Sequence, residues 1–383
     1  GANRAHLHRI HGGGESSGVT SSEGKPSEFA RWGRHDVATN KEMSYMRRRR
    51  RIAKQLVGRA STQQEKTMSE NSKAILEKPG TMVIVDCERP TPRPHEVVVK
   101  IARVGMCGSD IHGFKFGPYI PPQPGQIVGL GHEPSGVVTE VGANVTHLKV
   151  GDRVCLEPGE PCYRCEFCLA GHYNVCPQVD FLATAPNYRG AFAKYMAHPA
   201  QLVFKLPDDL TMDEGALVEP ASVATHAVEM AGALLGKTVV ILGGGAQGLM
   251  TTMIAKMSGA RAIVVVDLQQ RRLDKALELG ATAAIHGGDD DVVERIKAIV
   301  GQWGADVVFE TAGAVPTVKL GLQVVKRRGK IMVVGSVPGE APISFLAINR
   351  EVTVQTVFRY CNSYPTTIEL IRSGALKASA IVD

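Results

Sequence analysis

Four cysteines lie within a stretch of fifteen residues and are spaced C-x2-C-x2-C-x7-C (Cys162, Cys165, Cys168 and Cys176). Short spacings of this kind let four thiolates converge as a tetrahedron around one Zn²⁺. An iron–sulfur cluster and four unrelated core thiols are the alternatives. Because four cysteine ligands leave no coordination position open, we predict that this zinc is structural.

A second group of candidate ligands is spread along the chain. Cys107 follows an expected strand, His132 and Glu133 follow a loop rich in proline and glycine, and Glu219 precedes Pro220. A zinc ion that assists hydride transfer needs three protein ligands and one open position for the alcohol oxygen. Cys107 and His132 are suitable ligands, and either glutamate can supply a third or exchange with water.

Each of these residues also has an ordinary structural explanation. A lone cysteine is most often a core thiol, and a lone histidine more often forms a satisfied hydrogen bond than binds a metal. Glu219 reads as a carboxylate at the start of a helix, with Pro220 in the first helical position. The sequence does not establish that these groups meet in space. If they meet, Ser109 and His112 could relay the alcohol proton outward.

A strand that ends at Leu242 leads directly into a turn of the form G-x-G-x-x-G. Gly243 permits the tight turn, Gly245 lets the backbone approach a pyrophosphate, and Gly248 lets the following helix pack closely on the strand. We also count Gln247 of this turn among the cofactor contacts. A glycine-rich loop in a non-binding α/β domain is the alternative.

Asp267 lies nineteen residues beyond the last glycine of this turn, at the end of the next expected strand. A carboxylate at that point accepts hydrogen bonds from the adenosine ribose and repels a 2′-phosphate, so the sequence predicts NAD⁺. Arg271 and Arg272 follow closely. They can begin a helix over the sheet edge, stack on adenine, or tolerate a 2′-phosphate.

Two kinds of structure must position these groups. Up to about Phe204, β-branched runs such as Thr81–Asp86 and Glu96–Ala102 predict a β-rich region. From Pro220 onward, strands alternate with helices, which implies an α/β fold with a parallel sheet covered on both faces. The expected strands are Thr238–Leu242, Ala262–Val266, Asp306–Phe309 and Lys330–Val334, and the expected helices are Ala246–Ser258, Arg271–Leu279, Val292–Val300 and Val315–Val325.

Composition limits the remaining possibilities. The length of 383 residues suggests two domains, and 44% hydrophobic residues with 21% charged residues exclude global disorder. No apolar run can span a bilayer and no secretory signal is visible, so we expect a cytoplasmic protein without a membrane anchor. Residues 1–67 hold 14 of the 44 basic but only 6 of the 38 acidic side chains. The rest is nearly balanced, which gives no electrostatic case for nucleic acid.

Residues 1–67 are predicted to be a disordered leader, because they lack an apolar period and are rich in Gly, Ser, Arg and His. Met46 and the five arginines after it weakly resemble a transit peptide. The alternative is a non-native or over-extended start, with Met68 as the true first residue.

Over about residues 70–383 the motifs resemble, in order, those of zinc-dependent medium-chain dehydrogenases. They are Gly105–His112, Gly131–Glu133, the Cys quartet, Val218–Ala224 and the glycine-rich turn. Phe358–Asn362 resembles the sorbitol and xylitol dehydrogenase branch. The resemblance implies a GroES-like β-rich catalytic domain over residues 68–220 and a Rossmann doubly wound parallel-sheet domain over 221–357. It also implies a return to the catalytic domain over 358–383.

The same resemblance implies roles for individual residues. It assigns Cys107, His132 and Glu133 as ligands of a catalytic zinc, and it places Glu219 beside zinc-bound water or substrate. Arg359 and Tyr360 would face the polyol chain and the nicotinamide, although Arg359 can also be read as part of a structural ion pair. The residues expected to line the cofactor are Val334, Gly335, Ser336, Val357, Phe358 and Arg272.

Some features differ from the family pattern. Gly113 stands where sorbitol dehydrogenases commonly have a tyrosine that touches the substrate, and the family normally continues beyond the position that matches Asp383. The complete Cys quartet resembles microbial members and fungal arabinitol enzymes.

We therefore expect an NAD⁺-dependent enzyme, with one catalytic and one structural zinc, that oxidises a secondary alcohol of a small polyol to a ketose. A threonine or 2,3-butanediol dehydrogenase of the same superfamily is one alternative. A non-catalytic binding or structural protein that keeps the fold is another. We further expect a homo-oligomer, either a dimer or a tetramer.

Overall fold

The computed structural model describes residues 71–382, except for the side chain of Ala347. The predicted leader over residues 1–67 and the alternative start at Met68 lie outside the described residues. Within residues 71–382, no helix has both the length and the apolar composition needed to cross a membrane.

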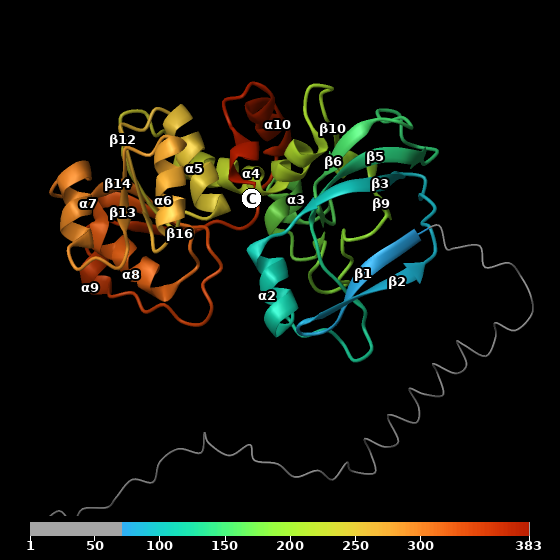
Figure 1. The fold of residues 1–383 in the computed structure, drawn as a ribbon, viewed down its shortest axis with the longest axis horizontal. Coiled ribbons are helices and arrows are strands. Elements are labelled where there is room, and N and C mark those ends of the chain that lie inside the picture. Colours follow the sequence, from blue (N-terminus) through green and yellow to red (C-terminus); the bar gives the residue numbers. More distant parts are fainter. Residues whose placement is uncertain (1–70, 383) are drawn as a thin grey trace, which may run out of the picture. The chain divides into compact units, whose positions relative to one another are not determined.

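The first part of the chain is β-rich, as predicted (Figure 1). A five-stranded antiparallel sheet has the order β10-β6-β5-β3-β9, a three-stranded sheet has the order β2-β1-β4, and β7 pairs with β8. The strands are β1 (Asn71–Lys78), β2 (Thr81–Cys87), β3 (Glu96–Gly105), β4 (Val128–Gly129), β5 (Glu133–Val141), β6 (Arg153–Leu156), β7 (Gly159–Glu160), β8 (Asp180–Phe181), β9 (Tyr195–Pro199) and β10 (Val203–Lys205).

Alternating valines explain why these strands form. Val97 and Val99 of β3 lie fully buried with Val138 of β5 and Val154 of β6 in one apolar cluster. β-Branched side chains suit a pleated surface that is buried on one face. The β3–β5 pairing also aligns Gly105 with Glu133, which brings together two of the sequence motifs.

The second part is a six-stranded parallel sheet with the order β13-β12-β11-β14-β15-β16, as the α/β prediction requires. Its strands are β11 (Thr238–Leu242), β12 (Ala262–Asp267), β13 (Ala283–His286), β14 (Ala305–Glu310), β15 (Val325–Val333) and β16 (Thr353–Thr356). Its helices are α5 (Ala246–Met257), α6 (Gln270–Glu278), α7 (Val292–Val300), α8 (Val315–Val324) and α9 (Phe345–Ile348).

Both faces of this parallel sheet are buried. Ile241 of β11 belongs to the core cluster that includes residues of α4, α5 and α6, whereas its neighbour Leu242 belongs to the cluster with Ile296 of α7 and Leu322 of α8. Successive strand residues point to opposite faces, so a strand covered on both sides reads as a continuous apolar run. This is why the strand predictions for β11, β12 and β14 were accurate to within a residue. The predicted strand Lys330–Val334 began five residues too late for β15, and β13 and β16 were not predicted.

The helix at Glu219 was predicted wrongly. The helix α4 runs from Met212 to Ala231, and Pro220 lies in its interior rather than at its first position. Thr211 is the N-cap, and it exchanges hydrogen bonds with Glu214 in a capping box. That T-x-x-E signal satisfies the free backbone N–H groups at the helix start. It therefore sets the beginning, and the predicted domain boundary between residues 220 and 221 falls inside the helix.

The helix α4 contacts both sheets. Ser135 of β5 donates a hydrogen bond to the Met212 carbonyl (2.6 Å) at one end, and Gln247 of α5 donates to the Pro220 carbonyl (3.0 Å) in the middle. The helix α10 (Tyr364–Arg372) packs against α4 after the chain leaves β16, as Figure 1 shows in red. The remaining helices are α2 (Gly108–Phe116), α3 (Glu166–Leu169), η1 (Tyr173–Val175), η2 (Ala200–Leu202) and η3 (Ala378–Ile381).

Candidate active site

The three candidate ligands Cys107, His132 and Glu133 meet in space. Their ligand atoms all lie within 4.8 Å of one another, with His132 and Glu133 buried. Cys107 caps the N-terminus of α2 just after β3, and His132 and Glu133 stand at the start of β5. The β3–β5 ladder therefore assembles the group from two sequence motifs. A thiol, an imidazole and a carboxylate form a donor set that suits zinc.

Gly105 makes room for the Glu133 carboxylate. The two residues face each other in the β3–β5 register, and a Cβ at position 105 would overlap Oε2 of Glu133. Any other residue would force the Glu133 carboxylate out of its present position. The glycine is therefore part of how the strand pair holds the ligand group.

Asp110 organises the same group, and the sequence analysis assigned it no role. Its buried carboxylate accepts hydrogen bonds from the backbone of Gly131 (2.8 Å) and Cys107 (3.1 Å), and it lies 3.5 Å from Nδ1 of His132. A carboxylate behind a histidine fixes the ring and leaves the other nitrogen for a metal. The position three residues after the helix N-cap was the available signal.

The ionisable groups at this point shift one another's pKa. Burial raises the pKa of Glu133 well above its ordinary value, and the nearby carboxylate of Glu219 raises it further. Burial also raises the pKa of Glu219, although His132 and Tyr360 act in the opposite direction. Burial alone would raise the pKa of Cys107, but contacts with His132 and Ser109 lower it. A divalent cation would stabilise all of these ionised groups together.

Glu219 pairs with one of the two residues expected to face the substrate. The hydroxyl of Tyr360 donates a 2.8 Å hydrogen bond to Oε1 of Glu219, and both residues are buried. The guanidinium of Arg359 stacks between the rings of Phe181 (3.9 Å) and Phe358 (4.6 Å). Phe181 was not predicted, because nothing in its local pattern marks a contact with a residue so distant in the chain.

Arg359 carries an unsatisfied donor. Its buried Nη1 has no hydrogen-bond partner among the described residues, and burial lowers the pKa of the guanidinium to about 10. A buried donor without a partner costs about 1–3 kcal/mol. No ion pair to an acidic side chain within residues 71–382 involves Arg359, so the alternative of a structural pair is not observed.

Ser109 and His112 lie on α2 beside the ligand group. Ser109 interacts with the Cys107 thiol, and the His112 ring stacks on Tyr119 at 3.9 Å between ring centres. Both side chains are partly exposed, so Ser109 and His112 lie between the Cys107 thiol and the solvent along α2. Their role as a proton relay stays a prediction.

The glycine-rich turn has the geometry that its motif predicts. Gly243 adopts φ +109°, a Cβ at Gly248 would overlap the Gly243 carbonyl, and Gly245 has open space beside it. Gly245 is also the N-cap of α5, where free backbone N–H groups favour a bound phosphate. The side chain of Gln247 donates to the Pro220 carbonyl of α4, and its contact with the cofactor stays a prediction.

Asp267 already has partners in the protein. Its carboxylate accepts hydrogen bonds from Gly244 N (2.7 Å) and Gln269 N (2.9 Å), and Nη1 of Arg272 lies 3.4 Å away. It therefore fixes the glycine-rich turn as well as carrying negative charge.

The other expected cofactor residues follow the carboxyl ends of β15 and β16, at the same sheet edge as the glycine-rich turn (Val334, Gly335, Ser336, Val357 and Phe358). Ligands of open parallel sheets bind at this edge. Glu310 at the end of β14, which was not predicted, is buried there. It accepts hydrogen bonds from Ala312 N (3.0 Å), Gly313 N (2.9 Å) and Thr317 Oγ1 (2.7 Å).

The Cys quartet also converges. The four sulfur atoms lie within 4.8 Å of one another, and Cys165 and Cys168 approach to 3.4 Å. Backbone N–H groups of Cys162, Cys165 and Gln178 point at quartet sulfurs at 3.4 Å, which stabilises thiolate charge. Every cysteine of the chain lies within the described residues and is a free thiol. The geometry fits one tetrahedral metal ion.

Comparison with known proteins identifies the family. Residues 93–208 match the model of the alcohol dehydrogenase GroES-like domain, and residues 246–373 match that of zinc-binding dehydrogenases. The chain belongs to the zinc-binding alcohol dehydrogenase family. It is thus an oxidoreductase of the zinc-type alcohol dehydrogenase class, with sorbitol dehydrogenases among its relatives.

Three relatives illustrate this membership. An uncharacterized zinc-type alcohol dehydrogenase-like protein of Escherichia coli is 53% identical over 314 residues, which cover 82% of this chain and 90% of that protein. The sorbitol dehydrogenase of Bacillus subtilis is 40% identical, with coverage of 82% and 90%. A zinc-binding dehydrogenase of Sinorhizobium meliloti, crystallised with NADP, is 33% identical with a TM-score of 0.74, and the match covers 80% of this chain and 89% of that one.

Substitution of Gly105 tests the first metal group. Gly105→Ala should displace the Glu133 carboxylate and lower zinc occupancy of the Cys107 group, while the Cys quartet keeps its metal. Zinc per chain measured by mass spectrometry should fall toward half of the wild-type value. Gly108→Ala, which has open space beside it, is the control and should keep full zinc. Full zinc in Gly105→Ala would contradict the steric argument.

Substitution of Cys165 tests the quartet. Cys165→Ser should lower the melting temperature by several degrees, because a four-thiolate zinc contributes directly to folding. Thermal melting together with zinc analysis makes the comparison, and Cys87→Ser, outside both metal groups, serves as the control. An unchanged melting temperature in Cys165→Ser would rule out a structural role for the quartet.

Proposed function

We propose that the protein is an NAD⁺-dependent zinc polyol dehydrogenase that oxidises a secondary alcohol of a small polyol to a ketose. The buried, unpartnered Nη1 of Arg359 beside the Glu219–Tyr360 pair carries this proposal. A guanidinium donor next to a buried acidic acceptor suits a ligand that presents several hydroxyl groups. The sorbitol dehydrogenase relatives support the same substrate class.

The residues divide the work of the proposed reaction. Cys107, His132 and Glu133 would hold the catalytic zinc, with Asp110 fixing the His132 ring. When bound, zinc lowers the pKa of the alcohol and the nicotinamide accepts the hydride. Ser109 and then His112 would pass the released proton along α2 to solvent.

Glu219 has a different task from the ligands. It is buried, accepts the Tyr360 hydrogen bond and raises the pKa of Glu133. In the proposed reaction, the Glu219 carboxylate would accept hydrogen bonds from substrate hydroxyls and keep the Tyr360 side chain in place. Arg359 would donate to the distal end of the polyol, with Phe181 and Phe358 excluding water around it.

NAD⁺ is the proposed cofactor because Asp267 places a carboxylate at the end of β12. Close like charges would disfavour the 2′-phosphate of NADP⁺. The opposite preference has two supports, the NADP bound to the Sinorhizobium neighbour and the side chain of Arg272 near Asp267. The measured preference for NAD⁺ or NADP⁺ therefore tests whether the negative charge of Asp267 or the positive charge of Arg272 has the larger effect on cofactor binding.

Two alternatives make different predictions. A threonine or butanediol dehydrogenase would turn over those substrates better than sorbitol, xylitol, arabinitol or galactitol in a panel with NAD⁺. A non-catalytic protein would produce no NADH with any of them in the presence of zinc. The Arg359–Tyr360 pair favours a polyol, and the converged Cys107 group favours an enzyme. A homo-oligomer stays a proposal.

Substitution of Asp267 tests the cofactor preference. Asp267→Ala should weaken NADH binding and narrow the preference for NADH over NADPH, because both the ribose contact and the anchor of Gly244 are lost. Fluorescence titration of both cofactors measures this, with Asp274→Ala on the exposed side of α6 as the control. If the wild type binds NADPH more tightly than NADH, the attraction of Arg272 for the 2′-phosphate outweighs the repulsion by Asp267.

Two substitutions separate a ligand from its neighbour. Cys107→Ala should abolish turnover while NADH binding survives, because the glycine-rich turn is part of another sheet. Glu219→Gln should keep zinc and lower kcat/KM for polyols by about 10–100-fold. Glu229→Gln, exposed on the same helix, is the control.

Zinc per chain is measured beside the kinetics of each variant. Near-normal turnover with full zinc in Cys107→Ala would remove that residue from the site. Unchanged polyol kinetics in Glu219→Gln would show that the charge of the Glu219 carboxylate does not contribute to substrate binding.

A further inference from the structure

The segment Phe358–Asn362 has an unusual backbone. Arg359 and Asn362 both lie in the left-handed region, at φ +55° and +59°. Asparagine tolerates this region, but for arginine it is costly and persists only where the surroundings hold it. The contacts that hold this segment therefore decide where the Arg359 and Tyr360 side chains point.

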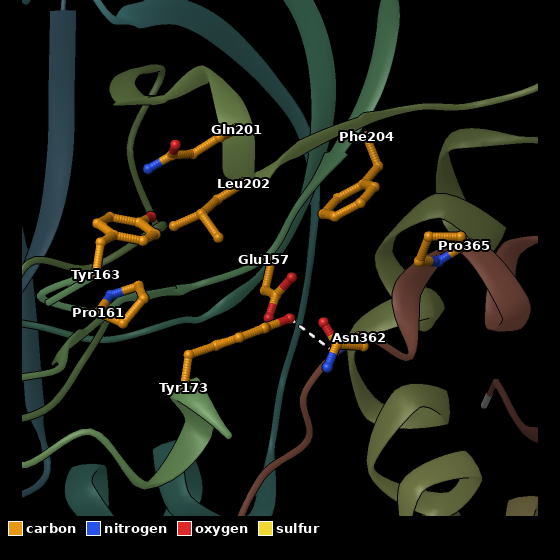
Figure 2. Close-up of a pocket in the computed structure, with 9 residues that line it drawn as sticks. All are labelled: Glu157, Pro161, Tyr163, Tyr173, Gln201, Leu202, Phe204, Asn362 and Pro365. Atoms are coloured by element: carbon orange, nitrogen blue, oxygen red, sulfur yellow. Dashed lines mark hydrogen bonds between the residues drawn. The ribbon is translucent and has the colours of Figure 1, made fainter. Parts of the chain in front are cut away.

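Those contacts come from the loop that carries the Cys quartet, residues 161–179. Nδ2 of Asn174 donates to the Phe358 carbonyl (2.8 Å), directly before Arg359. Asn362 N donates to the Tyr173 hydroxyl (2.8 Å), and its Nδ2 donates to the Gly171 carbonyl (3.1 Å). Figure 2 shows the Tyr173 hydroxyl pointing at the Asn362 backbone beside the buried Glu157. Arg359 and Tyr360 are thus held from both sides.

The same loop also supplies the surface under Arg359. The β7–β8 pairing, Gly159 with Phe181 and Glu160 with Asp180, closes the loop at its base. Phe181 thereby stands at the loop end, where its ring packs 3.9 Å from the Arg359 guanidinium. The loop contains one short α-helix and one 3₁₀ turn, and the Cys quartet joins the two ends of this segment.

We propose that the Cys-quartet loop positions the substrate-binding pair Arg359 and Tyr360, with Asn174 as the principal positioning residue. The metal held by the quartet would then serve substrate recognition as well as stability. This inference rests on the proposed function, because it takes Arg359 and Tyr360 as substrate contacts. Cofactor affinity should depend on the loop less than substrate KM does. Asp267 and α4 hold the glycine-rich turn, and only the expected cofactor residues Val357 and Phe358 belong to the segment that the loop contacts.

The test uses the full-length, zinc-loaded protein and the variant Asn174→Leu. Leucine has a similar volume but cannot donate to the Phe358 carbonyl. Asn144→Leu, at an exposed turn, is the matched control. We expect KM for the best polyol to rise about 3- to 10-fold, the range that loss of one hydrogen bond explains, with kcat and NADH affinity changed less than about twofold.

Hydrogen–deuterium exchange gives a readout that does not depend on activity. Peptides spanning residues 357–364 should exchange several-fold faster in Asn174→Leu than in the wild type, while peptides of the glycine-rich turn exchange at the same rate. If the wild type oxidises no polyol, the proposed function fails, and the exchange comparison still decides the positioning role.

A second variant tests the same inference if Asn174→Leu folds poorly. Asn362→Gly keeps the left-handed backbone without strain and loses only the contact with Gly171. It should raise KM and exchange in the same direction. Unchanged exchange at residues 357–364 in both variants, or a change confined to NADH affinity, would overturn the inference.

Discussion

The burial of several acidic groups in one small volume is the constraint on which the active site depends. Cys107, Glu133 and Glu219 lie close enough that each affects the ionisation of another. Two like charges 4 Å apart repel by about 4 kcal/mol at the dielectric of a protein surface, which exceeds the roughly 1 kcal/mol of one hydrogen bond. Such repulsion is relieved either by proton uptake, which the raised pKa of Glu133 favours, or by a bound cation.

The surrounding structure keeps these groups together in spite of that repulsion. The β3–β5 ladder fixes Cys107 and Glu133 through backbone pairing, which side-chain charge cannot shift. The helix α4 fixes Glu219 because the Thr211 capping box anchors its N-terminus and α5 and α10 pack along it. The groups of the acidic cluster are therefore held by one β-sheet and one long helix.

The sequence predicted those parts whose pattern is local. Four of the six parallel strands were found because a strand buried on both faces is a short apolar run. The edge strands β13 and β16 are less buried and were missed. The glycine-rich turn was found because each glycine has its own steric reason. The start of α4 was predicted too late because Pro220 was taken as the first helical residue. The T-x-x-E signal nine residues earlier, at Thr211, marks the true start. The Cys quartet was predicted from residue type and spacing, whereas the choice of Glu133 rather than Glu219 as the third ligand beside Cys107 and His132 came from the family resemblance.

Other contacts could not be predicted, because they join residues with no shared pattern. Asn174 and Phe358 are 184 positions apart, and their hydrogen bond exists only once the quartet loop and the segment after β16 are both folded. Asp110 acts on His132 across a loop of prolines and glycines, and Phe181 meets Arg359 through the β7–β8 pairing. Single-sequence periodicity carries no information on such pairs.

Two features of Arg359 each lower the stability of the folded protein. Its left-handed backbone costs about 1–3 kcal/mol, and its unpaired buried donor costs about as much again. Arg328 has a similar positive φ, but its side chain is exposed and pairs with Glu351. Arg359 instead stays between two aromatic rings, with the quartet loop bonded to both sides of its segment. The strain is therefore located where a hydroxyl-bearing ligand would supply the missing acceptor, and not at the cofactor turn, whose glycines adopt their backbone angles without strain.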